Sequence, residues 1–213
     1  MIGVYDYTVI LTYLSLASGL LSMVMAYQGN FVVAICCIIV SGILDMFDGV
    51  VARTKKNRTE DEKGFGIQLD SLCDVVCFGV APATFLYFYG VNTVYGIIIL
   101  VLYVLCAVIR LAFFNVLEAK RQQTEAGCAK YYRGLPVTTI AIILPIFYGI
   151  SHVIPNGTAD QIMLHILPLI VGFLFILDFK VPKPNISKLF EKKTKEQKNT
   201  KPQKEQEVQE TNV

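Results

Sequence analysis

The sequence predicts an all-α integral membrane protein, a bundle of six transmembrane helices. Of its 213 residues, 54% are hydrophobic, and they gather in long runs. Each run is close to the twenty or so residues with which a helix crosses a bilayer. The charged residues are segregated between these runs and in the C-terminal segment. This pattern indicates a membrane protein rather than a soluble domain.

Each apolar run is expected to form one helix. The first, over residues 7–27, is too long for a secretory signal peptide and has no basic residue in front of it, so we expect it to remain as a helix. The second covers residues 31–53, and the third covers residues 66–89 with a kink at Pro82. The remaining helices are expected over residues 92–115, 135–153 and 161–179.

Polar segments complete the chain. Residues 54–65 are expected to form a loop, and residues 116–134 a loop or a short surface helix. The six-helix membrane domain is assigned to residues 1–180. Residues 181–213 are rich in Lys, Glu, Gln and Thr and have no apolar period. They are therefore expected to form a disordered, charged cytoplasmic tail.

The basic residues predict the orientation. With residues 54–65 inside the cell, all 19 Lys and Arg lie on the cytoplasmic side or at cytoplasmic helix ends. The connections around residues 28–30, Gly90 and 152–160 carry none of them. We therefore expect a multi-pass protein of the cell (cytoplasmic) membrane. No nucleic-acid partner is expected, because the basic residues lie in loops and a tail without a recognised nucleic-acid motif.

Four aspartates lie in apolar surroundings: Asp45 and Asp48 near the end of the second run, and Asp70 and Asp74 near the start of the third. On helices, these spacings place each pair on one face. An antiparallel hairpin would bring all four toward a common point near the membrane surface. Acids in membrane helices cost about 2.5–3.5 kcal/mol each at the helix centre, so four together indicate a compensating ligand. Oxygen ligands at this density favour Mg²⁺, Mn²⁺ or Ca²⁺ over zinc.

Small residues accompany the acids. Gly49 and Ala52 continue the acidic face of the second run, and Gly66 lies one turn before the acids of the third. A flat or phosphorylated ligand can approach the backbone where side chains are this small. Arg53 adds a planar cation suited to phosphate. Together with the acids, these residues describe a site for a pyrophosphate bridged by divalent ions.

These residues form the pattern D-x-x-D-G-x-x-A-R from Asp45 to Arg53 and G-x-x-x-D-x-x-x-D from Gly66 to Asp74. The pattern resembles the signature of the CDP-alcohol phosphatidyltransferases, membrane enzymes that displace CMP from a CDP-linked lipid with an alcohol. Residues 54–65 make the connection between the halves longer than that family usually has, and we expect the extra residues in the surface loop. The resemblance implies an enzyme, and it implies a homodimer. The orientation predicted from the basic residues places the four aspartates near the cytoplasmic face.

The expected roles follow from this chemistry. The four aspartates are expected to hold two divalent ions, Mn²⁺ or Mg²⁺ with Ca²⁺ as a third candidate, roughly 3.5–4 Å apart. The residues expected to bind the CDP-lipid are Asp48, Gly49, Ala52, Arg53 and Gly66. An alcohol is a weak nucleophile near neutral pH, so a base must accept its proton. The resemblance assigns that catalytic role to Asp74.

Three further segments bear on the acceptor alcohol: LDSLCDVVCFGVAPA (69–83), RLAFFN (110–115) and YYRGLPVTT (131–139). They are similar to the equivalent segments of the phosphatidylserine synthases (CDP-diacylglycerol–serine O-phosphatidyltransferases) within the family. Phe113 is a departure, since relatives often carry a basic residue there. The similarity implies CDP-diacylglycerol and L-serine as substrates, with membrane lipids around the helices.

The residues alone leave the acceptor open. The carboxylate of serine needs a cation, and Arg110, at the cytoplasmic end of the fourth predicted helix, is the first candidate; Arg133 is the second. Alternatively, Arg110 extends its charged group from a helix end to the membrane surface without contacting substrate. Arg133 could likewise serve only as a basic residue that anchors its loop on the cytoplasmic side. Asn115 is either a donor to substrate or a C-terminal helix cap. Glycerol 3-phosphate, inositol and inositol phosphate remain alternative acceptors. The two phosphorylated alcohols would also need arginines, so charge alone cannot separate them from serine.

Two other classes of protein compete with an enzyme. Acids paired across membrane helices also describe the path of a cation transporter. A transporter predicts that polar residues continue toward the far side of the membrane, yet the outer halves of the predicted helices are nearly free of charge. A catalytically silent scaffold would leave the small residues as helix-packing positions.

Overall fold

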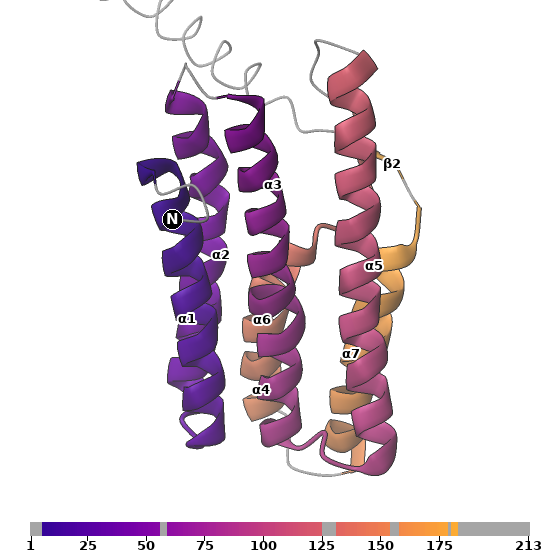
Figure 1. Cartoon of the computed structure of the whole chain (residues 1–213). Helices are drawn as coiled ribbons and strands as arrows, with labels where there is room; N and C mark the ends of the chain where they lie inside the picture. Colours follow the sequence, from indigo (N-terminus) through magenta and orange to yellow (C-terminus); the bar gives the residue numbers. More distant parts are fainter. Residues whose placement is uncertain (1–5, 56–58, 125–130, 154–157, 179, 183–213) are drawn as a thin grey trace, which may run out of the picture. The chain divides into compact units, whose positions relative to one another are not determined.

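A computed structural model describes residues 6–55, 59–124, 131–153, 158–178 and 180–182. The chain divides into two compact units. The first comprises residues 1–127 and 134–179, and the second comprises residues 128–133 and 180–213. Each is described by itself. The first unit is helical throughout its described residues (Figure 1).

Helices α1 (Ile10–Tyr27) and α2 (Phe31–Thr54) form an antiparallel hairpin, and a short 3₁₀ turn, η1 (Tyr7–Val9), precedes α1. The hairpin turns at Gly29, whose φ of 77° favours glycine. Small polar side chains let the two helices pack closely. The Ser15 and Ser41 hydroxyls lie 2.8 Å apart, and Ser18 donates to the carbonyl oxygen of Cys37 at 2.8 Å.

The third helix begins earlier than the sequence analysis predicted. α3 (Glu60–Asp74) starts six residues before Gly66, so the prediction of a loop through residue 65 was wrong. The reason is a capping box: the Glu62 backbone N–H donates to Thr59 Oγ1 at 3.2 Å, and the Thr59 N–H donates to Glu62 Oε2 at 3.0 Å. These reciprocal bonds satisfy two N–H groups that a helix start leaves unpaired.

α3 continues into α4 (Ala81–Tyr89) through a π-helical segment, η2 (Val75–Val80). The irregularity expected at Pro82 therefore takes the form of a change of hydrogen-bonding pattern just before the proline. A π-helical turn within an α-helix often accompanies a functional site. Here it follows directly on the acidic stretch of α3.

α5 (Val94–Thr124) continues nine residues beyond Asn115, into the segment for which a loop or short surface helix was expected. Residues 116–124 include Leu, Glu, Ala, Lys, Arg and Gln, which are strong helix formers, and this explains the extension. A 3₁₀ turn, η3 (Val137–Thr139), leads into α6 (Ile140–Val153), and α7 (Thr158–Ile176) follows. α7 packs along α5, and α6 packs against α2.

Within the described residues, four helical segments are long and apolar enough to cross a membrane. They are Tyr7–Tyr27, Phe31–Ala52, Glu60–Tyr89 and Val94–Ala119. α6 and α7 contain shorter apolar stretches, Val137–Ser151 and Ile162–Ile176. In the described part of the chain, the first unit is thus an all-helical membrane unit with four candidate spans, and the predicted count of six spans is not confirmed.

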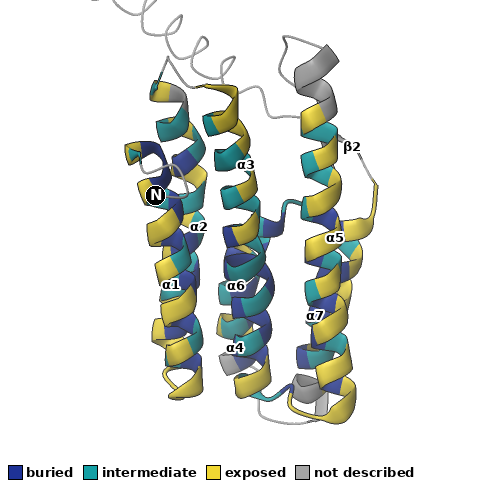
Figure 2. Cartoon of the chain, in the orientation of Figure 1, coloured by how far each residue is buried: buried dark blue, intermediate teal, exposed yellow. Residues whose placement is uncertain are grey.

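The outer faces of the long helices are apolar. Figure 2 shows exposed residues along their outward sides and buried residues between them. Large apolar side chains that are exposed include Leu14, Val33, Ile98 and Phe173. A soluble monomer rarely exposes so much contiguous apolar surface. The surface therefore suits contact with lipid.

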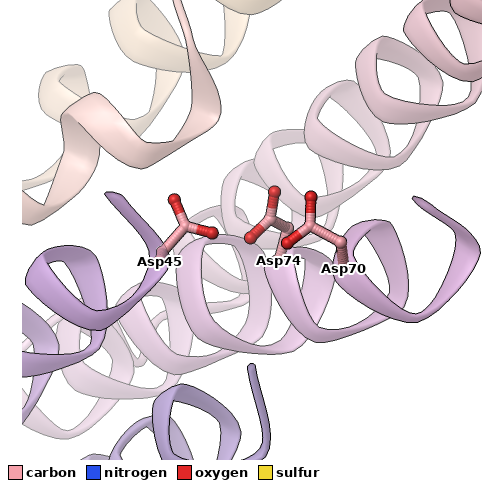
Figure 3. A group of neighbouring side chains, drawn as sticks. All are labelled: Asp45, Asp70 and Asp74. Atoms are coloured by element: carbon pink, nitrogen blue, oxygen red, sulfur yellow. The ribbon is translucent and has the colours of Figure 1, made fainter. Parts of the chain in front are cut away.

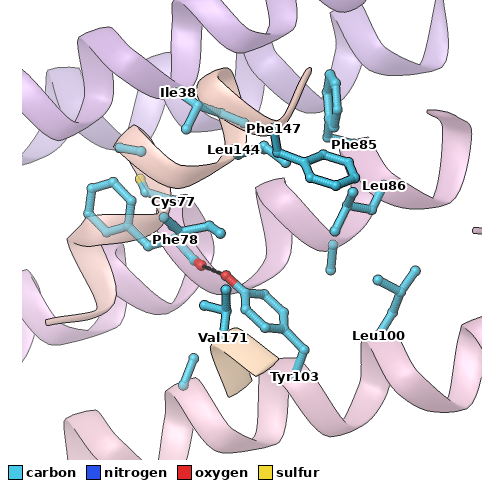
Figure 4. Close-up of a cluster of buried hydrophobic side chains, with 14 of the residues drawn as sticks. Ile38, Cys77, Phe78, Phe85, Leu86, Leu100, Tyr103, Leu144, Phe147 and Val171 are labelled. Atoms are coloured by element: carbon cyan, nitrogen blue, oxygen red, sulfur yellow. Dashed lines mark hydrogen bonds between the residues drawn. The ribbon is translucent and has the colours of Figure 1, made fainter. Parts of the chain in front are cut away.

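A buried apolar cluster holds the helices together (Figure 4). Phe78 of η2, Phe85 and Leu86 of α4, Tyr103 of α5 and Leu144 of α6 are all at most 1% exposed. The Tyr103 hydroxyl donates to the carbonyl oxygen of Phe78, which is consistent with the π-helical pattern there. Segment η2, which follows directly on the acids of α3, packs against α5 and α1.

The second unit contains two short antiparallel strands, β1 (Tyr131–Arg133) and β2 (Lys180–Pro182), in which Tyr131 lies opposite Pro182. Residues 183–213, most of the predicted tail, lie outside the described residues.

Candidate active site

Three aspartates from two helices meet in the first unit. One carboxylate oxygen each from Asp45 of α2 and from Asp70 and Asp74 of α3 lie within 4.8 Å of one another. Figure 3 shows Asp45 reaching from its helix toward Asp70 and Asp74 on the next. Asp70 and Asp74 share a face because they lie one helical turn apart. Helices α2 and α3 both pack against α1, and Asp45 of α2 reaches the same point.

The cluster is chemically suited to a divalent cation. Asp70 Oδ1 is a buried oxygen without a hydrogen-bond partner among the described residues. A buried acceptor in this state is costly unless something binds it. The neighbouring groups are also carboxylates, which repel it when they are charged. Hard oxygen donors crowded in this way fit Mg²⁺, Mn²⁺ or Ca²⁺.

Asp48 adjoins this group, because its carboxyl interacts with the carboxyl of Asp70. It is 8% exposed, and its Oδ2 accepts a hydrogen bond of 3.0 Å from the Thr12 hydroxyl of α1. It lines a pocket of about 140 Å³ to which Asp70 also contributes. Asp70 therefore belongs both to the three-carboxylate cluster and to the pocket, which joins the two parts of the site.

The pocket lies between the start of α1, the end of α2 and the first half of α3. Its lining residues are Thr8, Val9, Thr12, Asp48, Gly49, Ala52, Lys63, Gly66, Ile67 and Asp70. Gly49, Ala52 and Gly66 were singled out from the sequence as positions where a ligand can approach the backbone. All three residues, which come from two helices, line this pocket.

Sequence reasoning missed Thr8, Thr12 and Lys63. Thr8 and Thr12 are buried, 3% and 6% exposed. Their spacing of four residues places both on one face of the first apolar run, and that was the available signal. Lys63 was assigned to a loop, where its direction could not be inferred; it lies in the first turns of α3.

A charged cluster joins the three elements at this end of the unit. Lys55 Nζ lies 2.7 Å from Asp6 Oδ2 and 3.1 Å from Glu62 Oε1. The hydrogen bonds that Lys55 donates to Asp6, and secondarily to Glu62, raise the pKa of Lys55 above its ordinary value. Arg53 lies near the end of α2, and its side chain is outside the described residues.

Arg110 is placed differently from the prediction. It lies in the middle of α5, 8% exposed, so its assignment to a helix end was wrong because α5 continues to Thr124. Its Nη1 donates to the carbonyl oxygen of Phe175 at 3.2 Å, and its guanidinium lies 4.5 Å from the centre of the Phe114 ring. At Gly134 (φ 67°) a Cβ atom would lie 2.8 Å from Nη1, so this glycine leaves space for the guanidinium.

Of the other acceptor candidates, Asn115 is also inside α5, so the interpretation as a C-terminal cap was wrong. Its Oδ1 accepts a hydrogen bond of 2.9 Å from Ser71, the residue after Asp70. Arg133 lies in β1 of the second unit, and its side chain is outside the described residues.

Comparison with known proteins identifies a family and several relatives of the chain. The family model of the CDP-alcohol phosphatidyltransferases matches residues 8–176. An archaetidylserine synthase of Methanothermobacter thermautotrophicus is 33% identical over 175 residues, covering 82% of this chain and 68% of that protein. A CDP-diacylglycerol–serine O-phosphatidyltransferase of Helicobacter pylori is 32% identical over 172 residues, covering 79% of this chain and 68% of that protein.

A protein with the same name from Saccharomyces cerevisiae is 39% identical over 155 residues. The match covers 66% of this chain and 54% of the yeast protein, so the chain spans about half the length of that relative. No solved structure matches the chain significantly.

Proposed function

Because the chain belongs to the CDP-alcohol phosphatidyltransferase family, we propose that it transfers a phosphatidyl group from CDP-diacylglycerol to the hydroxyl of L-serine. The products are phosphatidylserine and CMP. The observation that carries the proposal is the meeting of Asp45, Asp70 and Asp74 beside a pocket walled by small residues. Serine is the proposed acceptor because several relatives are named for it.

The donor nucleotide binds in the pocket between α1, α2 and α3. Gly49, Ala52 and Gly66 leave its backbone walls open to the diphosphate. Lys63 and Arg53 supply cations for the phosphates, with Lys63 among the pocket residues and Arg53 at the corresponding position of the family pattern. The diacylglycerol chains remain against the apolar outer faces of the helices.

The four aspartates hold the divalent cations, Mn²⁺ or Mg²⁺, with Ca²⁺ as the third candidate. When bound, such cations neutralise the diphosphate and the departing CMP. The Asp70 oxygen that lacks a partner in the described part of the chain supports this assignment. Asp48 reaches the same region from the pocket wall that it shares with Asp70.

The transfer itself is a displacement at phosphorus. The serine hydroxyl oxygen forms a bond to the phosphorus that carries the diacylglycerol, and the bond from that phosphorus to the CMP oxygen breaks. Asp74 accepts the hydroxyl proton as the new bond forms. Arg110, Asn115 and Arg133 remain the candidates for holding serine. The Arg110 guanidinium already donates a hydrogen bond to the backbone carbonyl of Phe175, so a substrate would have to bind its remaining N–H groups.

The same site could serve a related reaction. An ether-linked donor is the second candidate, because one relative is named archaetidylserine synthase. Glycerol 3-phosphate, inositol and inositol phosphate remain the alternative acceptors. Membership of a transferase family favours all of these over the cation transporter that the acids alone left open.

The proposed setting is the cytoplasmic membrane, with α6 and α7 completing six crossings and the acids facing the cytoplasm. The basic residues of 54–65 and 116–134 support that orientation. Residues 1–180 then form the catalytic domain and residues 181–213 a charged cytoplasmic tail. A homodimer is the proposed assembly, as the family resemblance implies.

The test is a CMP-release assay with purified protein in detergent. CDP-diacylglycerol would be supplied with serine, glycerol 3-phosphate, inositol or inositol phosphate, with Mn²⁺, Mg²⁺ or EDTA. We expect CMP release that needs serine and a divalent cation. If CMP were released only with another alcohol, the proposal that serine is the acceptor would be overturned. If the protein were fully active in EDTA, the proposal that the aspartates hold divalent cations would be overturned.

A further inference from the structure

Helix α1 and the turn η1 before it carry none of the residues in the family pattern, yet they form one wall of the site. Thr8, Val9 and Thr12 line the pocket together with Asp48 and Asp70. α1 packs along α2 over its length, so its position relative to Asp48 is set by an extended interface. Among the described residues, the only polar side-chain groups on this wall of the pocket are the hydroxyls of Thr8 and Thr12.

One of these hydroxyls binds an acid directly. Thr12 Oγ1 donates to Asp48 Oδ2 at 3.0 Å, and the two residues are 6% and 8% exposed. A hydrogen bond to a carboxylate is stronger than one between neutral groups, and burial removes competing water. The bond therefore selects one orientation of the Asp48 carboxylate within the pocket.

We propose that Thr12 is a positioning residue, which holds Asp48 in the orientation that binds a divalent cation and the donor diphosphate. This inference rests on the proposed function. Residues that orient the ligands of a cation commonly affect its affinity or the activity by about 10–100-fold. Thr12 acts through Asp48, so its loss should weaken cation binding without removing a ligand.

The next polar contact along the same helices is a matched control. Ser15 bonds to Ser41 at 2.8 Å, one turn further along α1, and both are buried. Ser15→Ala removes a buried α1–α2 hydrogen bond that does not involve an aspartate. Thr12→Val removes the hydroxyl but preserves the shape, whereas Thr12→Ser preserves the hydroxyl.

The first measurement uses the purified protein in detergent without substrate. Thermal unfolding is followed while Mn²⁺ is titrated from an EDTA-treated sample. We expect Thr12→Val to need about tenfold more Mn²⁺ than the wild type for half of the stabilisation. Thr12→Ser and Ser15→Ala should follow the wild-type curve, although Ser15→Ala can lower the melting temperature at every Mn²⁺ concentration.

The second measurement is CMP release. Thr12→Val should lower kcat/KM by about 10–100-fold at limiting Mn²⁺ and recover part of it at saturating Mn²⁺. If Thr12→Val does not fold, Thr12→Ala, which removes the hydroxyl without adding bulk, is measured in its place. The proposal is overturned if the hydroxyl-free variant has wild-type Mn²⁺ dependence, if Thr12→Ser is equally impaired, or if Ser15→Ala shifts the Mn²⁺ curve as much.

The two proposals fail in distinguishable ways. If the wild type released no CMP with serine, the proposed function would fail. The Mn²⁺ titration of unfolding would still show whether Thr12 positions Asp48.

Discussion

The hydroxyl of Ser71 donates a hydrogen bond of 2.9 Å to Oδ1 of Asn115, and this bond joins the acid-bearing helix α3 to α5. It uses the oxygen of the Asn115 amide and leaves the NH₂ group as the part suited to an acceptor substrate. Asn115 therefore joins the two helices through its oxygen, and its NH₂ group is the part that we expect to bind the proposed serine substrate.

We expect Asn115→Leu to raise the KM for serine about tenfold, the equivalent of one hydrogen bond to a charged group. Ser71→Ala, which breaks only the bond between the helices, should change that KM by less than about threefold. Initial rates of CMP release at varied serine concentration would measure both. Equal increases in the two variants would mean that Asn115 acts through Ser71 alone.

Asp70→Asn should change activity and stability in opposite directions. The substitution removes one charge from three crowded carboxylates, at a residue with a buried oxygen that has no partner among the described residues. In EDTA we expect the melting temperature to rise by about 2–4 °C for each kcal/mol of repulsion relieved. CMP release with Mn²⁺ should fall by more than about 100-fold, since a cation ligand is lost.

The control for Asp70→Asn is Asp61→Asn, on the exposed first turn of the same helix. It should leave both the melting temperature and the activity near those of the wild type. A lower melting temperature of Asp70→Asn in EDTA would contradict the idea that the acids are strained without a cation.

Asp74→Asn should separate binding from chemistry. If Asp74 accepts the proton of the serine hydroxyl, the asparagine variant keeps donor affinity but loses turnover. Binding of CDP-diacylglycerol can be measured by its thermal stabilisation of the protein, and turnover by CMP release. Loss of donor binding with turnover intact would assign Asp74 to binding instead.

Lys63 should contribute to donor binding. Its Nζ lies 2.7 Å from Glu60 Oε1 in an exposed pair, an interaction that contributes little and that a phosphate could replace. We expect Lys63→Ala to raise the KM for CDP-diacylglycerol about tenfold and to leave the KM for serine unchanged. Glu60→Gln frees Lys63 from its pair and should not raise either KM. An effect of Lys63→Ala on serine alone would place the lysine on the acceptor side.

Helical periodicity accounts for what could be predicted about the site. Asp70 and Asp74 share a face because they are four residues apart, and Asp45 approaches them from α2. The start of α3 was missed although its signal, a threonine followed three residues later by a glutamate, stands in the sequence as Thr59 and Glu62. Residues 54–65 were predicted to be a loop because of their polar composition, although this capping signal was present.

The environment of the arginine in α5 could not be predicted in the same way. The end of that helix was placed where its apolar run ends, near Asn115, but strong helix formers carry it on to Thr124. Arg110 therefore lies inside the helix, and its contact with the carbonyl oxygen of Phe175 depends on how α7 packs against α5.

The amino-acid sequence by itself determined the apolar helices, the grouping of the acids and the small residues beside them, because each depends on spacing within one segment. Only the tertiary structure decided which partners these residues have. Thr12 and Asp48 are 36 residues apart in the chain, and Arg110 and Phe175 are 65 apart. Contacts between residues so far apart in the chain depend on how whole helices pack. No local pattern of residues in the sequence specifies that packing.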